Sequence, residues 1–149
     1  VRALPLPRDF QEALGSRFLA HPPIAPFTVR PVSSHPLVHG IGEFEVRDEL
    51  YLSEHSADIE VLLSTRWSGH VPRFADSDWT DAGEHPIAYL RREGRGQVYY
   101  LTLGHSRGHY DMAPLTDWWP EVDRGSWVTP AFDELIGRAL EWVVIEEDW

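Results

Sequence analysis

Hydrophobic residues alternate with polar ones or cluster over five short runs, and this pattern predicts strands. Two of the runs lie on either side of EGRG, a tight-turn sequence, and predict a β-hairpin. Another run is interrupted near its middle. The predicted strands are FTVRPV (27–32), the interrupted EFEVRDELYL (43–52), IEVLLST (59–65), PIAYLRR (86–92) and QVYYLTL (97–103).

Two helices are predicted, one near each end of the chain. Asp9 and Glu12 have the spacing of a capping box ahead of a short helix over residues 10–18. Thr129 is placed to cap the second helix, and Pro130 to occupy its first position. Apolar residues then recur at helical spacing and predict one buried stripe, formed by Phe132, Leu135, Ile136, Ala139, Leu140, Val143 and Val144.

Two long loops, 66–84 and 104–128, remain between these elements. Loops of about twenty residues are uncommon in a compact domain and are more often functional than decorative. The candidate chemistry is therefore sought first in and beside these loops.

The composition indicates a single globular domain over residues 1–149. Hydrophobic residues make up 42 % of the chain, an ordinary value for a folded protein. The net charge of −11 would repel a phosphate backbone, which argues against a nucleic-acid partner. The chain has no cysteine, so disulfides, thiolate metal sites and cysteine nucleophiles are excluded.

The sequence contains no segment that predicts a transmembrane span or a signal peptide. No apolar run approaches the roughly 20 residues that span a bilayer. The start, VRALPLPRDF, lacks the cationic and apolar regions of a signal peptide. We therefore expect a cytoplasmic protein with no membrane partner. Because the chain begins with Val1 and not with methionine, we expect it to be part of a longer chain.

The segment GHSRGHYD (104–111) is the most informative candidate site. A buried strand ends at Leu103, and Gly104 allows the chain to turn sharply. His105 is therefore expected at the edge of the sheet, where open α/β proteins bind ligands. An imidazole there can act as an acid, a base or a metal ligand. The alternative is a loop histidine that only hydrogen-bonds the backbone.

Other residues of the same loop could complete such a site. Asp111 could orient a histidine by accepting a hydrogen bond from its second nitrogen, and a loop-capping role is an equal alternative. His109 and Tyr110 are predicted to contact the substrate. So is Trp118, whose ring could stack on a sugar or instead pack the loop against the body of the domain.

A second group of candidates lies in the sequences DELY and FLAHPP. Adjacent residues of an extended chain point to opposite faces, so at most one of Asp48 and Glu49 can face a cleft. Glu49 shares its face with Tyr51, and we take Glu49 as the candidate carboxylate and Tyr51 as a substrate contact. A solvated pair of carboxylates is the alternative. His21, stiffened by two following prolines, is either a ligand residue or an ordinary surface residue.

Four motifs in this order are similar to those of the ThuA-like family, trehalose-utilisation domains related to class I glutamine amidotransferases. They are FxAHPP, HPLVHGIGEFEVRDELYL, HPIAYLRREGRGQVYYLTLGH and the terminal FxELIxRALxW, and they cover nearly the whole chain. The resemblance implies a flavodoxin-like α/β three-layer sandwich with a parallel sheet, and a role in carbohydrate metabolism. It also implies that further βα units precede this region, which would then be the C-terminal two thirds of the domain.

For the site, the resemblance implies a crevice lined by His21, Glu49 and His105. His105 is similar in place to the catalytic histidine of the amidotransferases, whose cysteine partner is absent here. Members of this family are candidates for binding a divalent metal through histidine and acidic side chains. The resemblance therefore implies zinc, held by these three residues, as a cofactor. A parallel sheet without its first strands would expose an edge and an apolar face, which favours a homo-oligomer or association with the missing N-terminal portion.

Two functions are therefore expected. The first is a sugar-directed enzyme, with His105, Glu49 and Asp111 as catalytic residues and a glycoside or keto-sugar as substrate. The expected reaction is a metal-assisted hydrolysis or isomerisation. The second is a non-catalytic module that holds a sugar or another protein through the tryptophan-bearing loop 104–128.

Overall fold

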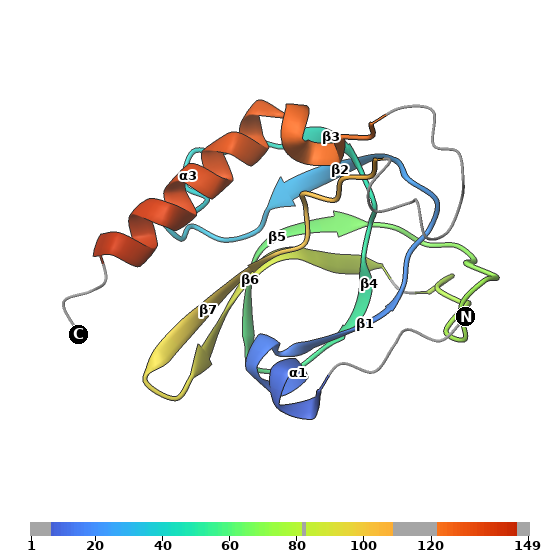
Figure 1. The fold of residues 1–149 in the computed structure, drawn as a ribbon, viewed down its shortest axis with the longest axis horizontal. Helices are drawn as coiled ribbons and strands as arrows, with labels where there is room; N and C mark the ends of the chain where they lie inside the picture. The colour runs from blue at the N-terminus through green and yellow to red at the C-terminus, as the bar shows by residue number, and fades with distance from the viewer. Residues whose placement is uncertain (1–6, 82, 109–121, 146–149) are drawn as a thin grey trace.

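The computed structural model describes residues 7–81, 83–108 and 122–145, which form a curled antiparallel sheet with helices at its margins (Figure 1). The elements in chain order are α1 (Arg8–Leu14), β1 (Ser16–Ala20), β2 (Ala25–Pro31), β3 (Phe44–Asp48), β4 (Leu52–His55), β5 (Ile59–Arg66), β6 (Glu84–Glu93), β7 (Gly96–Leu101), the 3₁₀ helix η1 (Gly125–Val128) and α3 (Pro130–Ile145).

The predicted strands are all present, and the hairpin around EGRG is confirmed. Five strands form one sheet in the order β3-β2-β5-β6-β7, and β1 pairs with β4 in a separate ribbon. Glu93 pairs with Gly96 at the end of the β6–β7 hairpin. The interruption predicted within residues 43–52 is the short segment 49–51, where the chain leaves β3 before it enters β4. This segment positions the candidate site.

The parallel sheet implied by the family resemblance is wrong for this chain, because every strand pairing is antiparallel. A parallel pair needs a long crossover connection, usually a helix. In the part of the chain that the structure describes, no helix lies between β1 and β7. The fold is a mixed α/β arrangement, and the flavodoxin-like three-layer sandwich is not confirmed.

Helix α1 is shorter than predicted and is not capped as predicted. It ends at Leu14, because Gly15 adopts a left-handed conformation (φ 68°) and the chain continues into β1. The capping box of Asp9 and Glu12 is wrong: Pro7 is the N-cap and makes no side-chain cap bond. Glu12 instead accepts a hydrogen bond from Arg8 Nε at 2.8 Å.

Helix α3 starts at Pro130 as predicted, but its second half is mostly exposed, with Trp142 partly buried against the core. Phe132 and Leu135 belong to the core, whereas Leu140, Val143 and Val144 are exposed. Arg138 lies between the buried and the exposed apolar residues of the helix. Its Nη1 donates to the carbonyl of His39 at 2.7 Å. The continuous buried stripe predicted for this helix is therefore wrong beyond that point.

The core lies between the sheet, the β1–β4 ribbon and the first turns of α3. Its buried hydrophobic residues are Ala20, Val29, Leu37, Val38, Val46, Leu50, Leu52, Leu62, Leu63, Val71, Ile87, Ala88, Leu90, Leu103, Phe132 and Leu135. Among the described residues, no helix is long and apolar enough to cross a membrane.

Candidate functional site

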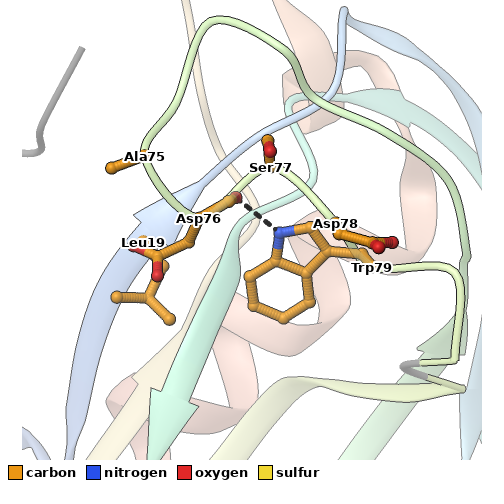
Figure 2. A pocket seen from close by; sticks show the side chains of 6 residues that line it. All are labelled: Leu19, Ala75, Asp76, Ser77, Asp78 and Trp79. Carbon is orange, nitrogen blue, oxygen red and sulfur yellow. Dashed lines mark hydrogen bonds between the residues drawn. The ribbon is translucent and has the colours of Figure 1, made fainter.

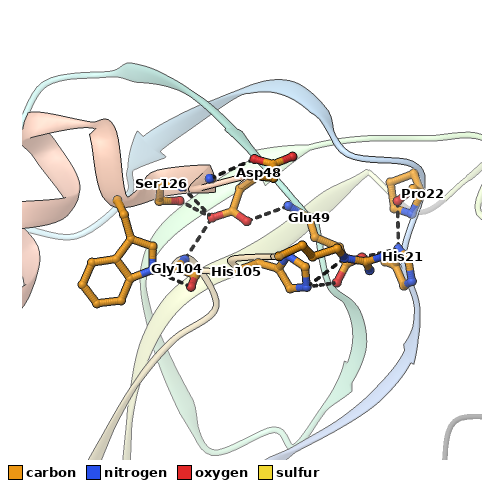
Figure 3. Close-up of polar contacts among 11 residues, drawn as sticks. His21, Pro22, Asp48, Glu49, Gly104, His105 and Ser126 are labelled. Atoms are coloured by element: carbon orange, nitrogen blue, oxygen red, sulfur yellow. Dashed lines mark hydrogen bonds and ion pairs between the residues drawn. The ribbon is translucent and has the colours of Figure 1, made fainter. Parts of the chain in front are cut away.

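The carboxylate of Glu49 is the centre of the candidate site (Figure 3). Its side chain is only 5 % exposed, and three side chains contact it. Oε1 accepts from Nη2 of Arg107 at 2.6 Å and lies 3.0 Å from Nδ1 of His21. Oε2 faces Nε2 of His105 at 3.1 Å. Two segments remote in sequence, the FLAHPP turn and the loop after β7, thus meet at one buried carboxylate.

The contacts of the two imidazoles differ. Nδ1 of His21 faces two acceptors, Glu49 and the Pro22 carbonyl at 2.9 Å, so it is the donor, and the free lone pair of the neutral ring is on Nε2. Nε2 of His105 faces an acceptor, Oε2 of Glu49 at 3.1 Å, and a donor, Nε of Arg107 at 3.5 Å. Its role as donor or acceptor therefore depends on the protonation state of the ring.

Aromatic side chains surround His21. Its ring stacks on Phe18, with centroids 6.1 Å apart, and meets the edge of Phe74 at 4.9 Å. Tyr51 packs against Phe18 at 5.1 Å. Burial, and after it the negative charge of Glu49, raises the pKa of Tyr51 to about 12. The Tyr51 hydroxyl therefore stays protonated at neutral pH and is a hydrogen-bond donor beside the Glu49 centre.

Asp48, one residue earlier, faces a different set of partners (Figure 3). It is 1 % exposed, and its Oδ1 accepts from the Glu49 amide at 2.7 Å. Its Oδ2 accepts from the amides of Gly104 at 2.9 Å and of Ser126 at 3.3 Å, and from the Ser126 hydroxyl. We call Asp48, Gly104 and Ser126 the Asp48 latch. It joins the end of β3 to the loop that carries His105 and to η1.

Two further contacts hold the backbone of the His105 loop. Trp127 Nε1 donates to the Gly104 carbonyl at 2.8 Å. Gly125 has φ +50°, and a Cβ there would collide with the His105 carbonyl oxygen, so only glycine fits without strain. The imidazole of His105 thus projects from a backbone that is fixed on both sides.

Asp123 adds an ion pair at the edge of the latch. Its Oδ2 accepts from Arg47 Nη1 at 2.7 Å, and its Oδ1 accepts from the Gly125 amide at 3.1 Å. The hydrogen bond from Arg47 is the main cause that lowers the pKa of Asp123. Backbone hydrogen bonds between Asp123 and Arg107, both 2.8 Å, connect this corner to the Glu49 centre.

The structure places the predicted residues as follows. His21, Glu49 and His105 are brought together, and Tyr51 lies beside them. The alternative of a solvated carboxylate pair at residues 48 and 49 is wrong, since both side chains are buried. The remaining predicted site residues fall outside the described ranges: His109, Tyr110, Asp111 and Trp118.

Sequence reasoning missed two residues, Arg107 and Ser126. Arg107 lies two positions after His105, so its place in the same loop was a usable signal. Ser126 had no such signal, because its partner Asp48 is 78 positions away.

The expected zinc site does not fit the side chains as they are arranged. Within residues 7–81, 83–108 and 122–145, no group of three or more histidine, aspartate or glutamate side chains is placed to hold a metal ion. Oε1 of Glu49 accepts from Arg107, and both oxygens lie within about 3 Å of imidazole nitrogens, so the carboxylate already has protein partners. Zinc bound by His21, Glu49 and His105 therefore stays a prediction that these contacts do not support.

Comparison with known proteins identifies the family. The family model for ThuA, described as trehalose utilisation, matches residues 4–118, and the chain belongs to this family. A solved structure of a ThuA-like protein from Parabacteroides merdae ATCC 43184 is similar, with a TM-score of 0.55 and 19 % sequence identity. The similarity covers 86 % of this chain and 40 % of that protein, so this chain spans less than half of its length. A search of curated proteins finds no match.

Proposed function

We propose that this chain belongs to a carbohydrate-metabolism protein that acts on a glycoside or keto-sugar at the Glu49 centre. Membership of the trehalose-utilisation family supports the substrate class. The observation that carries the proposal is the buried Glu49 carboxylate bound by both His21 and His105. A buried acid that orients two imidazoles is typical of acid–base chemistry.

In this proposal, the two histidines exchange protons with the sugar. The ring nitrogens that do not contact Glu49, Nε2 of His21 and Nδ1 of His105, are the atoms proposed to accept a proton from a hydroxyl or from a carbon next to a carbonyl. Both side chains are partly exposed, at 26 % and 18 %, so solvent and ligand can reach them. Glu49 stabilises the imidazolium that forms, because each ring has a nitrogen within about 3 Å of its carboxylate.

Arg107 and Tyr51 are the proposed substrate-binding donors. Arg107 is 25 % exposed and uses one nitrogen on Glu49, which leaves other N–H groups of its guanidinium to bind a sugar oxygen. Tyr51 supplies a neutral hydroxyl. We assign no step to a metal. A zinc ion would need the same atoms of Glu49 that now contact the histidines and Arg107.

The experiment compares turnover of trehalose, other glucosides and their keto derivatives, with products followed by NMR. We expect His21→Ala, His105→Ala and Glu49→Gln to lose turnover, and Asp81→Asn, an exposed loop carboxylate, to keep it. Metal analysis of freshly purified wild type and His105→Ala tests the zinc prediction in the same samples. Equal turnover and equal metal content in wild type and His105→Ala would remove His105 from this account.

A second candidate function is sugar binding without turnover. Trp127 favours it, because its ring is 54 % exposed and is held beside the His105 loop by its bond to Gly104. Tryptophan rings that are partly exposed and fixed in place are suited to stacking on sugars. Calorimetry with the same sugars would then show affinity that falls in Trp127→Ala and is unchanged in His105→Ala and Glu49→Gln.

The proposal extends to the partners of the chain. We propose a small-molecule sugar as ligand, and self-association or association with a further N-terminal portion of the protein. Exposed Leu140, Val143 and Val144 on α3 are consistent with such an association. Light scattering of the purified chain, with Val143→Glu as the comparison, would measure it.

A further inference from the structure

A pocket of about 410 Å³ lies away from the Glu49 centre (Figure 2). One residue comes from β1 and the rest come from the loop between β5 and β6: its lining is Leu19, Ala75, Asp76, Ser77, Asp78 and Trp79. Figure 2 shows Leu19 and Asp76 on one side and the indole of Trp79 on the other. The volume lies within the range of small-molecule sites.

The loop that forms this pocket is held in one conformation. Gly69 and Trp79 exchange backbone hydrogen bonds of 3.3 and 2.9 Å, and the Val71 amide donates to the Ser77 carbonyl at 2.9 Å. Val71 is itself part of the core. The walls of the pocket are therefore formed before any ligand arrives, which lowers the entropic cost of binding.

The indole of Trp79 is fixed within this loop. Its Nε1 donates to the Asp76 carbonyl at 2.8 Å, and its ring packs against His85, with centroids 5.8 Å apart. The ring also lines the pocket. A rigid aromatic wall of this kind suits the C–H face of a sugar ring.

Polar groups of the same pocket can bind sugar hydroxyls. Asp76 is exposed, and its carboxylate has no hydrogen-bond or ion-pair partner among the described residues. Asp78 uses Oδ1 to accept from the amide and hydroxyl of Thr80, at 3.1 and 2.8 Å, which leaves Oδ2 for a ligand. Carboxylate oxygens accept only, so the ligand must donate, as the hydroxyls of a sugar do.

We propose that this pocket is a binding subsite for one neutral sugar ring, stacked on Trp79 and hydrogen-bonded to Asp76. An anionic ligand is disfavoured by the two carboxylates and by the net charge of −11. A quaternary ammonium ligand is recognised by several aromatic rings together, and this pocket offers one. The proposal goes beyond the proposed reaction, because binding here uses none of the residues around Glu49.

The pocket is connected to the Glu49 centre through neighbouring residues. Phe74, in the same loop, packs on the ring of His21 at 4.9 Å, and Leu19 is two residues before His21. A disaccharide is therefore tested beside a single sugar ring. Methyl α-glucoside and trehalose are accordingly the two probes.

The test is a titration of the ¹⁵N-labelled chain with methyl α-glucoside and with trehalose, followed by NMR at the indole and amide signals of residues 75–79. We expect saturable shifts there in the wild type and dissociation constants about tenfold higher in Trp79→Ala and Asp76→Asn. Asp81→Asn, which removes the same charge from the same loop outside the pocket, should bind as the wild type does. Glu49→Gln should also bind normally, which separates this subsite from the proposed reaction.

Several outcomes would overturn the subsite. They are the absence of saturable binding by either sugar, binding that is unchanged in Asp76→Asn and Trp79→Ala, shifts confined to residues around Glu49, and tighter binding of choline than of either sugar. Circular dichroism checks that each variant is folded. If Trp79→Ala is unfolded, Trp79→Phe takes its place, with an expected dissociation constant between those of the wild type and Asp76→Asn.

Discussion

Asp48 and Glu49 are neighbours, both are acidic and both are buried, yet they have different partners. Asp48 accepts from backbone amides and one hydroxyl, which carry no charge. Glu49 accepts from a guanidinium and lies against two imidazoles. The comparison shows that burial of a carboxylate does not by itself mark a functional group. The chemistry of its donors separates a structural acid from a candidate catalytic one.

The partners also differ in their access to solvent. The donors to Asp48 are fixed in the backbone at Gly104 and Ser126, and Ser126 is fully buried. The partners of Glu49 are side chains that are between 18 % and 26 % exposed. A ligand can reach the second set and not the first. The following predictions test this division of roles, starting with the largest expected effect.

Replacing Asp48 should cost stability more than any other single change at this corner. In Asp48→Ala, the amides of Glu49, Gly104 and Ser126 and the Ser126 hydroxyl lose their acceptor. Buried donors without a partner cost about 1–3 kcal/mol each before water and relaxation reduce the sum. We expect the free energy of unfolding to fall by about 3 kcal/mol or more, measured by urea denaturation. A loss below about 1 kcal/mol would show that the latch is not structural.

Replacing Glu49 should affect activity more than stability. In Glu49→Gln, the two imidazoles lose the carboxylate that orients them, and such partners typically change activity about 10- to 100-fold. Arg107 is partly exposed and can be solvated when its partner is lost, so the stability loss should be smaller than in Asp48→Ala. Turnover and urea denaturation of both variants give the comparison. The division of roles would be wrong if Glu49→Gln lost more stability than Asp48→Ala and kept its turnover.

Replacing Gly125 tests the close backbone approach at the latch. Gly125→Ala places a Cβ against the His105 carbonyl at a positive φ of 50°. The matched control is Gly40→Ala, where φ is +75° and nothing lies within 4 Å of the new Cβ. Both variants carry the backbone strain of about 1 kcal/mol, and only the first carries the collision. We expect Gly125→Ala to have the lower melting temperature of the two, and equal values would contradict the contact.

The smallest expected effect concerns acid. Because Arg47 lowers the folded-state pKa of Asp123 below the usual 3.8, this carboxylate stabilises the protein above pH 3.8. This contribution to the free energy of unfolding is lost as the pH falls through the lowered pKa of Asp123. Arg47 is 56 % exposed, so we expect less than about 1 kcal/mol.

The measurement compares the unfolding free energies of the wild type and Asp123→Asn between pH 5 and pH 2. The wild type should be the more stable at pH 5, and the difference should shrink at the acid end. Glu43→Gln, which removes the exposed ion pair with Arg30, is the control for a general change in charge. A difference that does not vary with pH would show that the Asp123 pair is not the cause.

Much of the secondary structure could be predicted, because the signals are local. The hairpin turn at residues 93–96, the strands on either side of it and the start of α3 at Pro130 all follow from short-range patterns. The candidate site was predicted in part. The position of His105 after a buried strand pointed to the correct loop, and the family resemblance pointed to His21 and Glu49.

The errors arose where contacts between distant segments decide the structure. The apolar stripe of α3 was predicted as one buried face, but only Phe132 and Leu135 of that stripe are fully buried, and Leu140, Val143 and Val144 are exposed. Strand direction was taken from the family resemblance and was wrong. Hydrophobic patterning does not distinguish short parallel from antiparallel strands when both are partly buried.

By itself, the sequence determined most of the strands of the five-stranded sheet and the hairpin turn, the reaction classes that are impossible without cysteine, and the loop that carries His105. Only the tertiary structure decided that the strands pair antiparallel. It also brought His21, His105 and Arg107 to Glu49, and placed Ser126 where it donates hydrogen bonds to Asp48. The physical reason is the range of the interactions. Turns and strands are encoded over a few residues, whereas the donors to a buried carboxylate come from wherever the folded chain brings them.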